Sequence, residues 1–162
     1  MLNKIKYSFF KNHLKKPIYL IFFVTSKCNS RCKHCFFSKE LNNPVPDLSL
    51  AEIDKFSKEL GKLIWLDLSG GEPFMRKDLF EIYKIFVKNN KVESFSIPTN
   101  GILTDKIYED TLKMLEFGGV KNLNITLSLE GKEKIHDDIR GVKCYGKLLE
   151  TYNKLAPLKK IY

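Results

Sequence analysis

Residues 18–35 read IYLIFFVTSKCNSRCKHC, an apolar run that leads directly into three closely spaced cysteines. The apolar part, Ile18–Val24, is rich in β-branched and aromatic side chains, which is typical of a strand that is buried on both faces. It is too short to cross a membrane, because a spanning helix needs about 20 apolar residues. We therefore expect a buried strand, followed by a polar loop that carries the cysteines.

The alternation of strand, loop and helix recurs along the rest of the chain. We expect further strands at 64–68, 95–97 and 123–127, and helices at 49–60, 78–88, 104–117 and 145–155. Ser49 and Glu52 have the spacing of a capping box, and Thr104 is placed to cap the helix that follows it. Strands that alternate with helices predict right-handed crossovers and a parallel sheet. A closed eightfold barrel needs at least about 200 residues, so the expected fold is α/β, with about four parallel βα units in an incomplete TIM-like partial barrel.

The composition and the charge distribution exclude several classes of protein. The chain has 162 residues, of which 43% are hydrophobic and 29% charged, values that exclude collagen, low-complexity disorder and a coiled coil. The net charge of +9 belongs to the first quarter, because residues 1–39 carry nine Lys or Arg and no Asp or Glu. A uniformly basic nucleic-acid-binding domain is therefore excluded. We divide the chain into a basic N-terminal extension, residues 1–16, predicted to be helical, and a core domain, residues 17–162.

The start of the chain also bears on its location. Its apolar run is at the lower limit for a secretory signal, and no Ala-x-Ala cleavage site follows. We therefore expect a cytoplasmic protein without a membrane span. Cysteines stay reduced in that compartment, and clusters of them favour metals over disulfides.

The loops that follow the four expected strands are all polar. They are Thr25–Cys28, Ser69–Pro73, Pro98–Gly101 and Ser128–Gly131. In parallel βα architectures, the active site lies at the carboxyl ends of the strands. We expect these four loops to converge on one functional site.

Cys28, Cys32 and Cys35 form a C-x3-C-x2-C set, whereas Cys144 is distant in the sequence. Thiolates are soft ligands for iron–sulfur clusters, zinc or cuprous ions. A four-iron cluster usually has four cysteine ligands, so three cysteines indicate a cluster with one iron open to an outside ligand. A zinc site completed by Cys144 or a histidine, a disulfide with a spare thiol, and three unmetallated cysteines remain alternatives.

Together these motifs resemble the radical S-adenosylmethionine (radical SAM) enzymes. The cysteine loop is similar to their signature, and Gly70-Gly71-Glu72-Pro73 is similar to their glycine-rich motif after the second strand. Thr99–Gly101 and Ser128–Gly131 resemble the family's third and fourth strand ends. The stretch from His136 to Gly141 resembles the peptide- and cofactor-maturing, SPASM-type branch. The resemblance extends from about residue 18 to residue 155.

The resemblance implies a [4Fe–4S] cluster held by Cys28, Cys32 and Cys35, with SAM chelating the fourth iron. It implies SAM contacts for eight further residues. They are His34 beside the adenine, Gly70, Gly71 and Glu72 near the methionine amino group, Asn100 at the pocket, Ser128 at the ribose or methionyl group, Glu130 at a ribose hydroxyl, and Arg140 at the carboxylate. Structural alternatives remain for His34, for the Gly-Gly turn, for Asn100 as part of a turn, and for Arg140 as a surface ion pair. We expect His136 to be a structural or capping residue and Cys144 to be a lone thiol.

The implied reaction is reductive cleavage of SAM to a 5′-deoxyadenosyl radical, which abstracts a substrate hydrogen in peptide or cofactor maturation. No side chain is assigned as a catalytic acid or base. The resemblance further implies an electron donor such as a flavodoxin or ferredoxin, and an unidentified substrate that can be a peptide.

The chain departs from the family pattern in one respect. The usual core has six βα units, and only four are found here, so we interpret residues 17–162 as a truncated core. It is a fragment, a split enzyme completed by a partner chain, or a domain that pairs with itself. Two other functions compete: a non-catalytic iron–sulfur or metal-binding scaffold, and an RNA- or membrane-surface-binding module that uses the basic first 39 residues.

Overall fold

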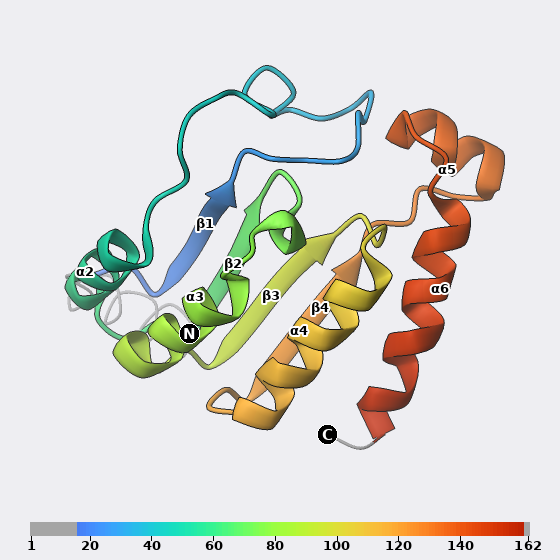
Figure 1. Ribbon diagram of the computed structural model, residues 1–162. Helices are drawn as coiled ribbons and strands as arrows, with labels where there is room; N and C mark the ends of the chain where they lie inside the picture. Colours follow the sequence, from blue (N-terminus) through green and yellow to red (C-terminus); the bar gives the residue numbers. More distant parts are fainter. Residues whose placement is uncertain (1–15, 161–162) are drawn as a thin grey trace, which may run out of the picture.

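Four parallel strands alternate with helices in the computed structural model, which describes residues 16–160 (Figure 1). The strands are β1 (Tyr19–Thr25), β2 (Trp65–Gly70), β3 (Ser94–Thr99) and β4 (Asn122–Leu127). They pair in the order β1-β2-β3-β4, and all three pairs are parallel. The expected α/β partial barrel of four parallel strands is therefore confirmed, as an open sheet. The helix expected in the N-terminal extension lies outside the described residues.

The helices agree with the expected ones, with one addition. They are α2 (Leu50–Leu60), α3 (Leu79–Asn90), α4 (Thr104–Phe117), α5 (Glu133–Arg140) and α6 (Tyr145–Leu155), with short 3-10 turns η1 (Pro73–Met75) and η2 (Ala156–Lys160). The Ser49 and Glu52 capping box is present. Helix α5 was not predicted, because its sequence EKIHDDIR has too few apolar residues to show a stripe. Within residues 16–160, every helix falls short of the length and apolarity that a bilayer-spanning segment requires.

The predicted cap at Thr104 is wrong. Helix α4 begins at Thr104 itself, and Leu103 occupies the cap position without a side-chain hydrogen bond. The Thr104 hydroxyl instead forms a hydrogen bond with the Thr151 hydroxyl on α6, at 2.8 Å. A tertiary contact between two helices has therefore replaced the local one.

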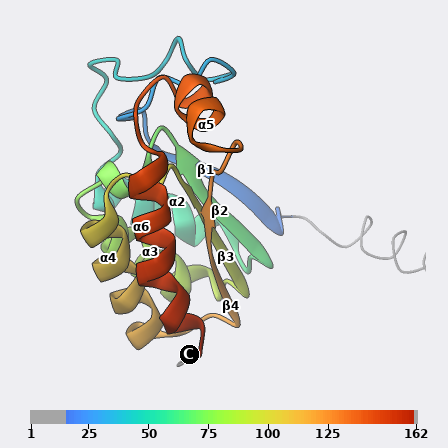
Figure 2. The same cartoon turned by 90° about the vertical axis from the view of Figure 1, so that its right-hand side faces the viewer.

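Among residues 16–160, the helices cover one face of the sheet, as Figure 2 shows edge-on. The helix-facing side chains, such as Leu66, Leu68, Phe95 and Ile97, are fully buried. The expectation that β1 is buried on both faces is wrong, because Tyr19 and its neighbours on the other side are exposed and no element among residues 16–160 covers them. We call this uncovered side the inner face. From alternation and register, its residues are Tyr19, Ile21, Phe23, Trp65, Asp67, Ser69, Ser94, Ser96, Pro98, Asn122, Asn124 and Thr126.

A buried arginine joins the strand ends to the helices. The side chain of Arg76 is only 6% exposed. Its guanidinium donates to the carbonyl of Val24 at the end of β1, to the carbonyl of Leu48 before α2, and to both carboxylate oxygens of Asp78 at the start of α3. The adjacent guanidinium lowers the pKa of Asp78. One side chain therefore fixes three segments that no sheet bond connects.

Replacing Arg76 should destabilise the fold. Arg76→Ala leaves the Asp78 carboxylate and two carbonyls without their partner, and removing one member of a buried pair costs about 3 kcal/mol or more. Arg76→Lys keeps the charge but not the planar fork, so an intermediate loss is expected. Urea unfolding measures both values.

Lys147→Ala is the matched control, because it breaks an exposed pair with Glu150 on α6. Such surface pairs contribute about 0–1 kcal/mol. A loss for Arg76→Ala no larger than that for Lys147→Ala would contradict the role given to Arg76.

Candidate functional site

The three cysteines lie on the long segment between β1 and α2, which contains no helix or strand. Figure 1 shows this segment passing over the carboxyl ends of the strands toward α5. Cys28, Cys32 and Cys35 are partly exposed free thiols. Partial burial raises the pKa of the Cys28 thiol. We call residues 26–42 the cysteine loop.

Backbone hydrogen bonds fix the cysteine loop on two sides. On the β2 side, the N–H of Glu72 donates to the carbonyl of Lys27 at 2.8 Å. On the α5 side, the N–H groups of Arg31 and Lys33 donate to the carbonyls of Arg140 and Ile139, at 3.0 and 2.9 Å. Because α5 was not predicted from the sequence, this second anchor was not foreseen.

The two glycines at the end of β2 are required because the end of β1 and the cysteine loop lie very close to them. A Cβ on Gly71 would lie 2.2 Å from the carbonyl oxygen of Lys27, and one on Gly70 would lie 2.4 Å from that of Thr25. Gly70 also has a φ of +116°, which side chains of L-residues rarely adopt. The glycine motif therefore allows the loop and the end of β2 to touch.

Glu72 joins the ends of β2 and β3. Its side chain is buried, and its carboxylate accepts hydrogen bonds from the Thr99 hydroxyl at 2.7 Å and from the backbone N–H groups of Asn100 and Phe74 at 2.8 and 3.3 Å. Burial raises the pKa of this carboxyl. Thr99 was not singled out from the sequence, because a threonine at a strand end carries no distinctive signal.

Asn100 extends this network into the cysteine loop. Its amide nitrogen donates to Asn29 Oδ1 at 2.7 Å and to Ser30 Oγ at 3.0 Å, while its oxygen accepts from the N–H of Ile102. Asn42 closes the loop by pairing with both backbone groups of Cys28, at 3.0 and 3.1 Å. Asn42 was missed from the sequence, since nothing in its spacing relates it to Cys28.

Arg140 lies on the opposite side of the loop. Its guanidinium donates to the carbonyl of Ser128 at 2.8 Å, to Glu130 Oε1 at 2.6 Å and to the sulfur of Cys32 at 3.4 Å. The exposed His34 places Nε2 3.8 Å from the same Glu130 oxygen. The residues predicted from the fourth strand end therefore gather beside the cysteine loop.

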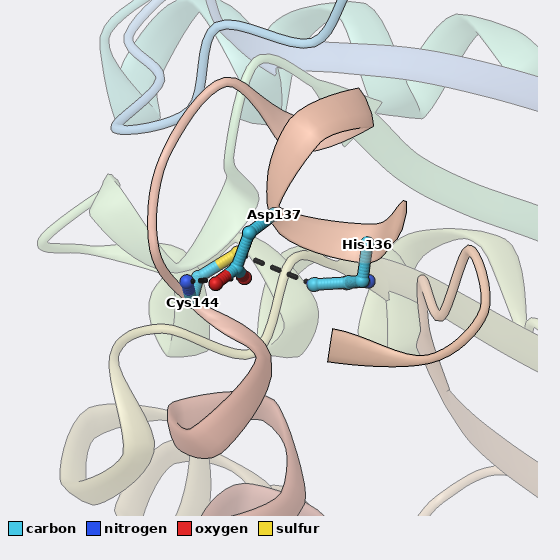
Figure 3. A group of neighbouring side chains, drawn as sticks. All are labelled: His136, Asp137 and Cys144. Atoms are coloured by element: carbon cyan, nitrogen blue, oxygen red, sulfur yellow. Dashed lines mark hydrogen bonds between the residues drawn. The ribbon is translucent and has the colours of Figure 1, made fainter. Parts of the chain in front are cut away.

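His136 and Asp137 of α5 form a second cluster with Cys144, which directly precedes α6 (Figure 3). The N–H of Glu130 donates to His136 Nδ1, so the proton of the neutral ring lies on Nε2, which is 3.2 Å from the Cys144 sulfur. Asp137 accepts from the N–H groups of Cys144 and Tyr145. A metal at Nε2 would need that nitrogen free of its proton, so the donor set is arranged for hydrogen bonds. This agrees with a structural His136.

The three loop thiols suit a multi-iron cluster better than a single ion. In tetrahedral zinc, Zn–S bonds of about 2.3 Å place ligand sulfurs about 3.8 Å apart. Among residues 16–160, the loop thiols do not form such a group, whereas His136, Asp137 and Cys144 have ligand atoms within 4.8 Å of one another. A [4Fe–4S] cluster takes cysteine thiolates as ligands, so the chemistry of this donor set fits such a cluster.

The chain matches a known family over most of its length. A family model described as the Radical SAM superfamily matches residues 22–160. A probable GTP 3′,8-cyclase of Archaeoglobus fulgidus is 38% identical over 114 residues, which cover 68% of this chain and 36% of that protein. A GTP 3′,8-cyclase of Clostridium perfringens is 31% identical, with 84% of this chain and 42% of that protein covered. The chain thus spans less than half the length of these relatives.

Solved structures share the fold. The crystal structure of Streptococcus suis SuiB bound to S-adenosylmethionine has a TM-score of 0.68 at 18% identity, covering 99% of this chain and 36% of that one. The structure of anSMEcpe with bound AdoMet and the Cp18Cys peptide has a TM-score of 0.65 at 23% identity, covering 87% and 40%. At these identities the likeness concerns the architecture alone.

Gly71→Ala should prevent the cysteine loop from closing on β2, because the new methyl group would overlap the Lys27 carbonyl. We expect iron bound per chain after anaerobic reconstitution to fall severalfold. Gly146→Ala is the matched control, since it lies in α6 with no atom within 4 Å of the added Cβ. It should gain about 1 kcal/mol of helix stability and keep full iron. Equal iron in both variants would contradict the packing argument.

Stability should also depend on pH through His136. Burial and the nearby Arg140 charge lower the pKa of His136, so folding favours the neutral ring. This contribution is complete above the unfolded pKa of about 6.5 and is lost as pH falls toward the lower folded pKa. The difference in unfolding free energy between wild type and His136→Gln should therefore shrink between pH 7.5 and 5.5. A constant difference would contradict a buried neutral His136.

Proposed function

Because the chain belongs to the radical SAM superfamily, we propose that it forms the cluster- and SAM-binding part of an enzyme that generates a 5′-deoxyadenosyl radical for hydrogen abstraction. The proposed process is the maturation of a peptide or a cofactor. The superfamily uses a [4Fe–4S] cluster and SAM. When the cluster is bound, it would supply the electron for the cleavage of SAM. The rest of the barrel would come from further chain or from a partner, and the electron from a flavodoxin or ferredoxin.

The observation that carries this proposal is the position of the three thiols. Cys28, Cys32 and Cys35 share one loop, which backbone hydrogen bonds hold between the glycine motif and α5. Three cysteines leave one iron of a four-iron cluster without a protein ligand. Such an iron can take the amino and carboxylate groups of SAM.

The surrounding residues have properties that suit the two ends of the methionyl group. Gly70, Gly71 and Glu72 are assigned to the ammonium, since backbone carbonyls and a carboxylate accept hydrogen bonds from a cation. Arg140 is suited to the carboxylate, since guanidinium binds carboxylates in a bidentate manner. Its present partner Glu130, at 2.6 Å, would then share Arg140 with SAM.

The remaining proposed contacts concern the nucleoside. Ser128 and Glu130 lie beside Arg140 and are assigned to the ribose or methionyl group. His34, exposed on the loop between the last two cysteines, is assigned to the adenine. Asn100, tied to Asn29 and Ser30, is assigned to shaping the pocket rim.

The test is anaerobic reconstitution with iron and sulfide, followed by EPR of the reduced protein and an assay for 5′-deoxyadenosine. We expect a [4Fe–4S] signal that changes when SAM is added, and release of 5′-deoxyadenosine. A cluster that ignores SAM would contradict the proposal and favour a non-catalytic scaffold. Zinc in place of iron would overturn both.

Single cysteine variants sharpen the assignment of ligands. Cys32→Ala should reduce bound iron from about four atoms per chain to a small fraction, because one cluster corner loses its ligand. Cys144→Ala is the matched control, since this thiol bonds His136 within the structural cluster, and it should keep the iron. Loss of iron in Cys144→Ala, with retention in Cys32→Ala, would show that the ligands are assigned wrongly.

A further inference from the structure

The inner face of the sheet has an unusual charge distribution for a chain with a net charge of +9. Among its twelve residues, Asp67 on β2 is the single charged side chain, and the strands place no Lys, Arg or His on this face. Toward β4 the face is neutral and polar, with Ser96, Asn124 and Thr126. Toward β1 it is apolar and aromatic.

Two aromatic rings accompany the Asp67 carboxylate. Tyr19 on β1 and Trp65 on β2 are register partners, and their rings stack with centroids 6.4 Å apart and an interplanar angle of 13°. The Tyr19 hydroxyl donates a short hydrogen bond to Asp67 Oδ2. Tyr19 is 51% exposed, so the group remains open to solvent on the inner face.

A carboxylate beside stacked aromatic rings is complementary to a cation. The faces of tyrosine and tryptophan attract ammonium and guanidinium groups, and a carboxylate adds a charge-assisted hydrogen bond. Tyr19 occupies Oδ2 of Asp67, while no hydrogen bond to Oδ1 is found among the described residues. The same arrangement repels a phosphate, since like charges placed close together oppose binding.

The basic side chains of the cysteine loop do not belong to the inner face. They are Lys27, Arg31, Lys33 and Lys39. Lys33 is already paired with Asp138 on α5, at 2.6 Å. None of the four belongs to the strands, so Asp67 carries the only charge among the inner-face residues of the four described strands.

We propose that Tyr19, Trp65 and Asp67 form a subsite for a cationic group of the substrate, an ammonium or a guanidinium. The substrate is then an amine- or guanidine-bearing compound with apolar surface, and not a nucleoside triphosphate such as the GTP named in the relatives. This inference depends on the proposed function in one respect, namely that the inner face of the sheet binds the substrate.

Trp65 provides a direct reporter, because it is the single tryptophan of the chain. Its fluorescence would be followed while the full chain is titrated with n-butylguanidinium, with the neutral n-pentanol of similar shape, and with GTP. The proposal predicts a saturable change with n-butylguanidinium and none with the other two. A response to GTP at lower concentration, or no saturable response to the cation, would overturn it.

Variants separate charge from aromatic contact. Asp67→Asn should weaken binding of n-butylguanidinium about tenfold, within the range of charged contacts. Tyr19→Leu should weaken it about two- to fivefold through loss of the ring, whereas Tyr19→Phe should keep most of the affinity. Glu150→Gln removes an equal charge from α6 and should change nothing. Equal affinity in Asp67→Asn and Glu150→Gln would refute the subsite.

This experiment needs neither iron nor SAM, so its outcome is independent of the radical chemistry. Cation binding without 5′-deoxyadenosine formation would leave the subsite standing and overturn the proposed function. The reverse result would overturn the subsite alone.

Discussion

The hydrogen bonds that hold the cysteine loop between β2 and α5 are the constraint on which the site depends. This segment has no secondary structure of its own, so its three thiols are positioned by neighbours. Glu72 holds it from one side through the Lys27 carbonyl, and the last turn of α5 holds it from the other. Glycines are needed at both contacts, because a Cβ on Gly71 or Gly141 would lie within 2.4 Å of a loop carbonyl.

Two side chains of opposite charge complete this framework. The carboxylate of Glu72 is buried and satisfied by three donors from β3 and η1. The guanidinium of Arg140 is bonded to Ser128, Glu130 and Cys32. Buried charges are tolerated when they are paired and hydrogen-bonded, and here the partners come from the carboxyl ends of β2, β3 and β4. The same contacts that stabilise the loop therefore bring the predicted site residues together.

Much of this was predictable from sequence, because it depends on local patterns. The four strands follow from apolar runs, α2 from its Ser49 and Glu52 capping box, and the location of the site from the polar strand ends. The exceptions depend on partners distant in the sequence. Arg76 forms a hydrogen bond with β1, and Asn42 forms hydrogen bonds with Cys28. The sequence separation of the partners matches no known motif in either case. The exposure of Tyr19 follows from the expected partial barrel, whose interior is uncovered, whereas the apolar run by itself predicted burial on both faces.

Members of one superfamily can share their radical chemistry and still bind different substrates, and we assign the choice of substrate to the inner face. The relatives act on GTP by name, and the solved neighbours include a peptide complex. The family match over residues 22–160 shows the superfamily and not the substrate. The proposal assigns the choice of substrate to the inner-face residues of the strands. In this chain these residues include the carboxylate of Asp67 and the rings of Tyr19 and Trp65, which would disfavour binding of an anion at this place.

The central claim is that three cysteines hold a four-iron cluster with one iron open to an outside ligand. Mössbauer spectroscopy of the protein reconstituted with ⁵⁷Fe, recorded with and without SAM, tests it most directly. The account predicts that one iron in four changes its isomer shift and quadrupole splitting when SAM binds, while the other three do not. Four irons that remain unchanged by SAM would contradict it.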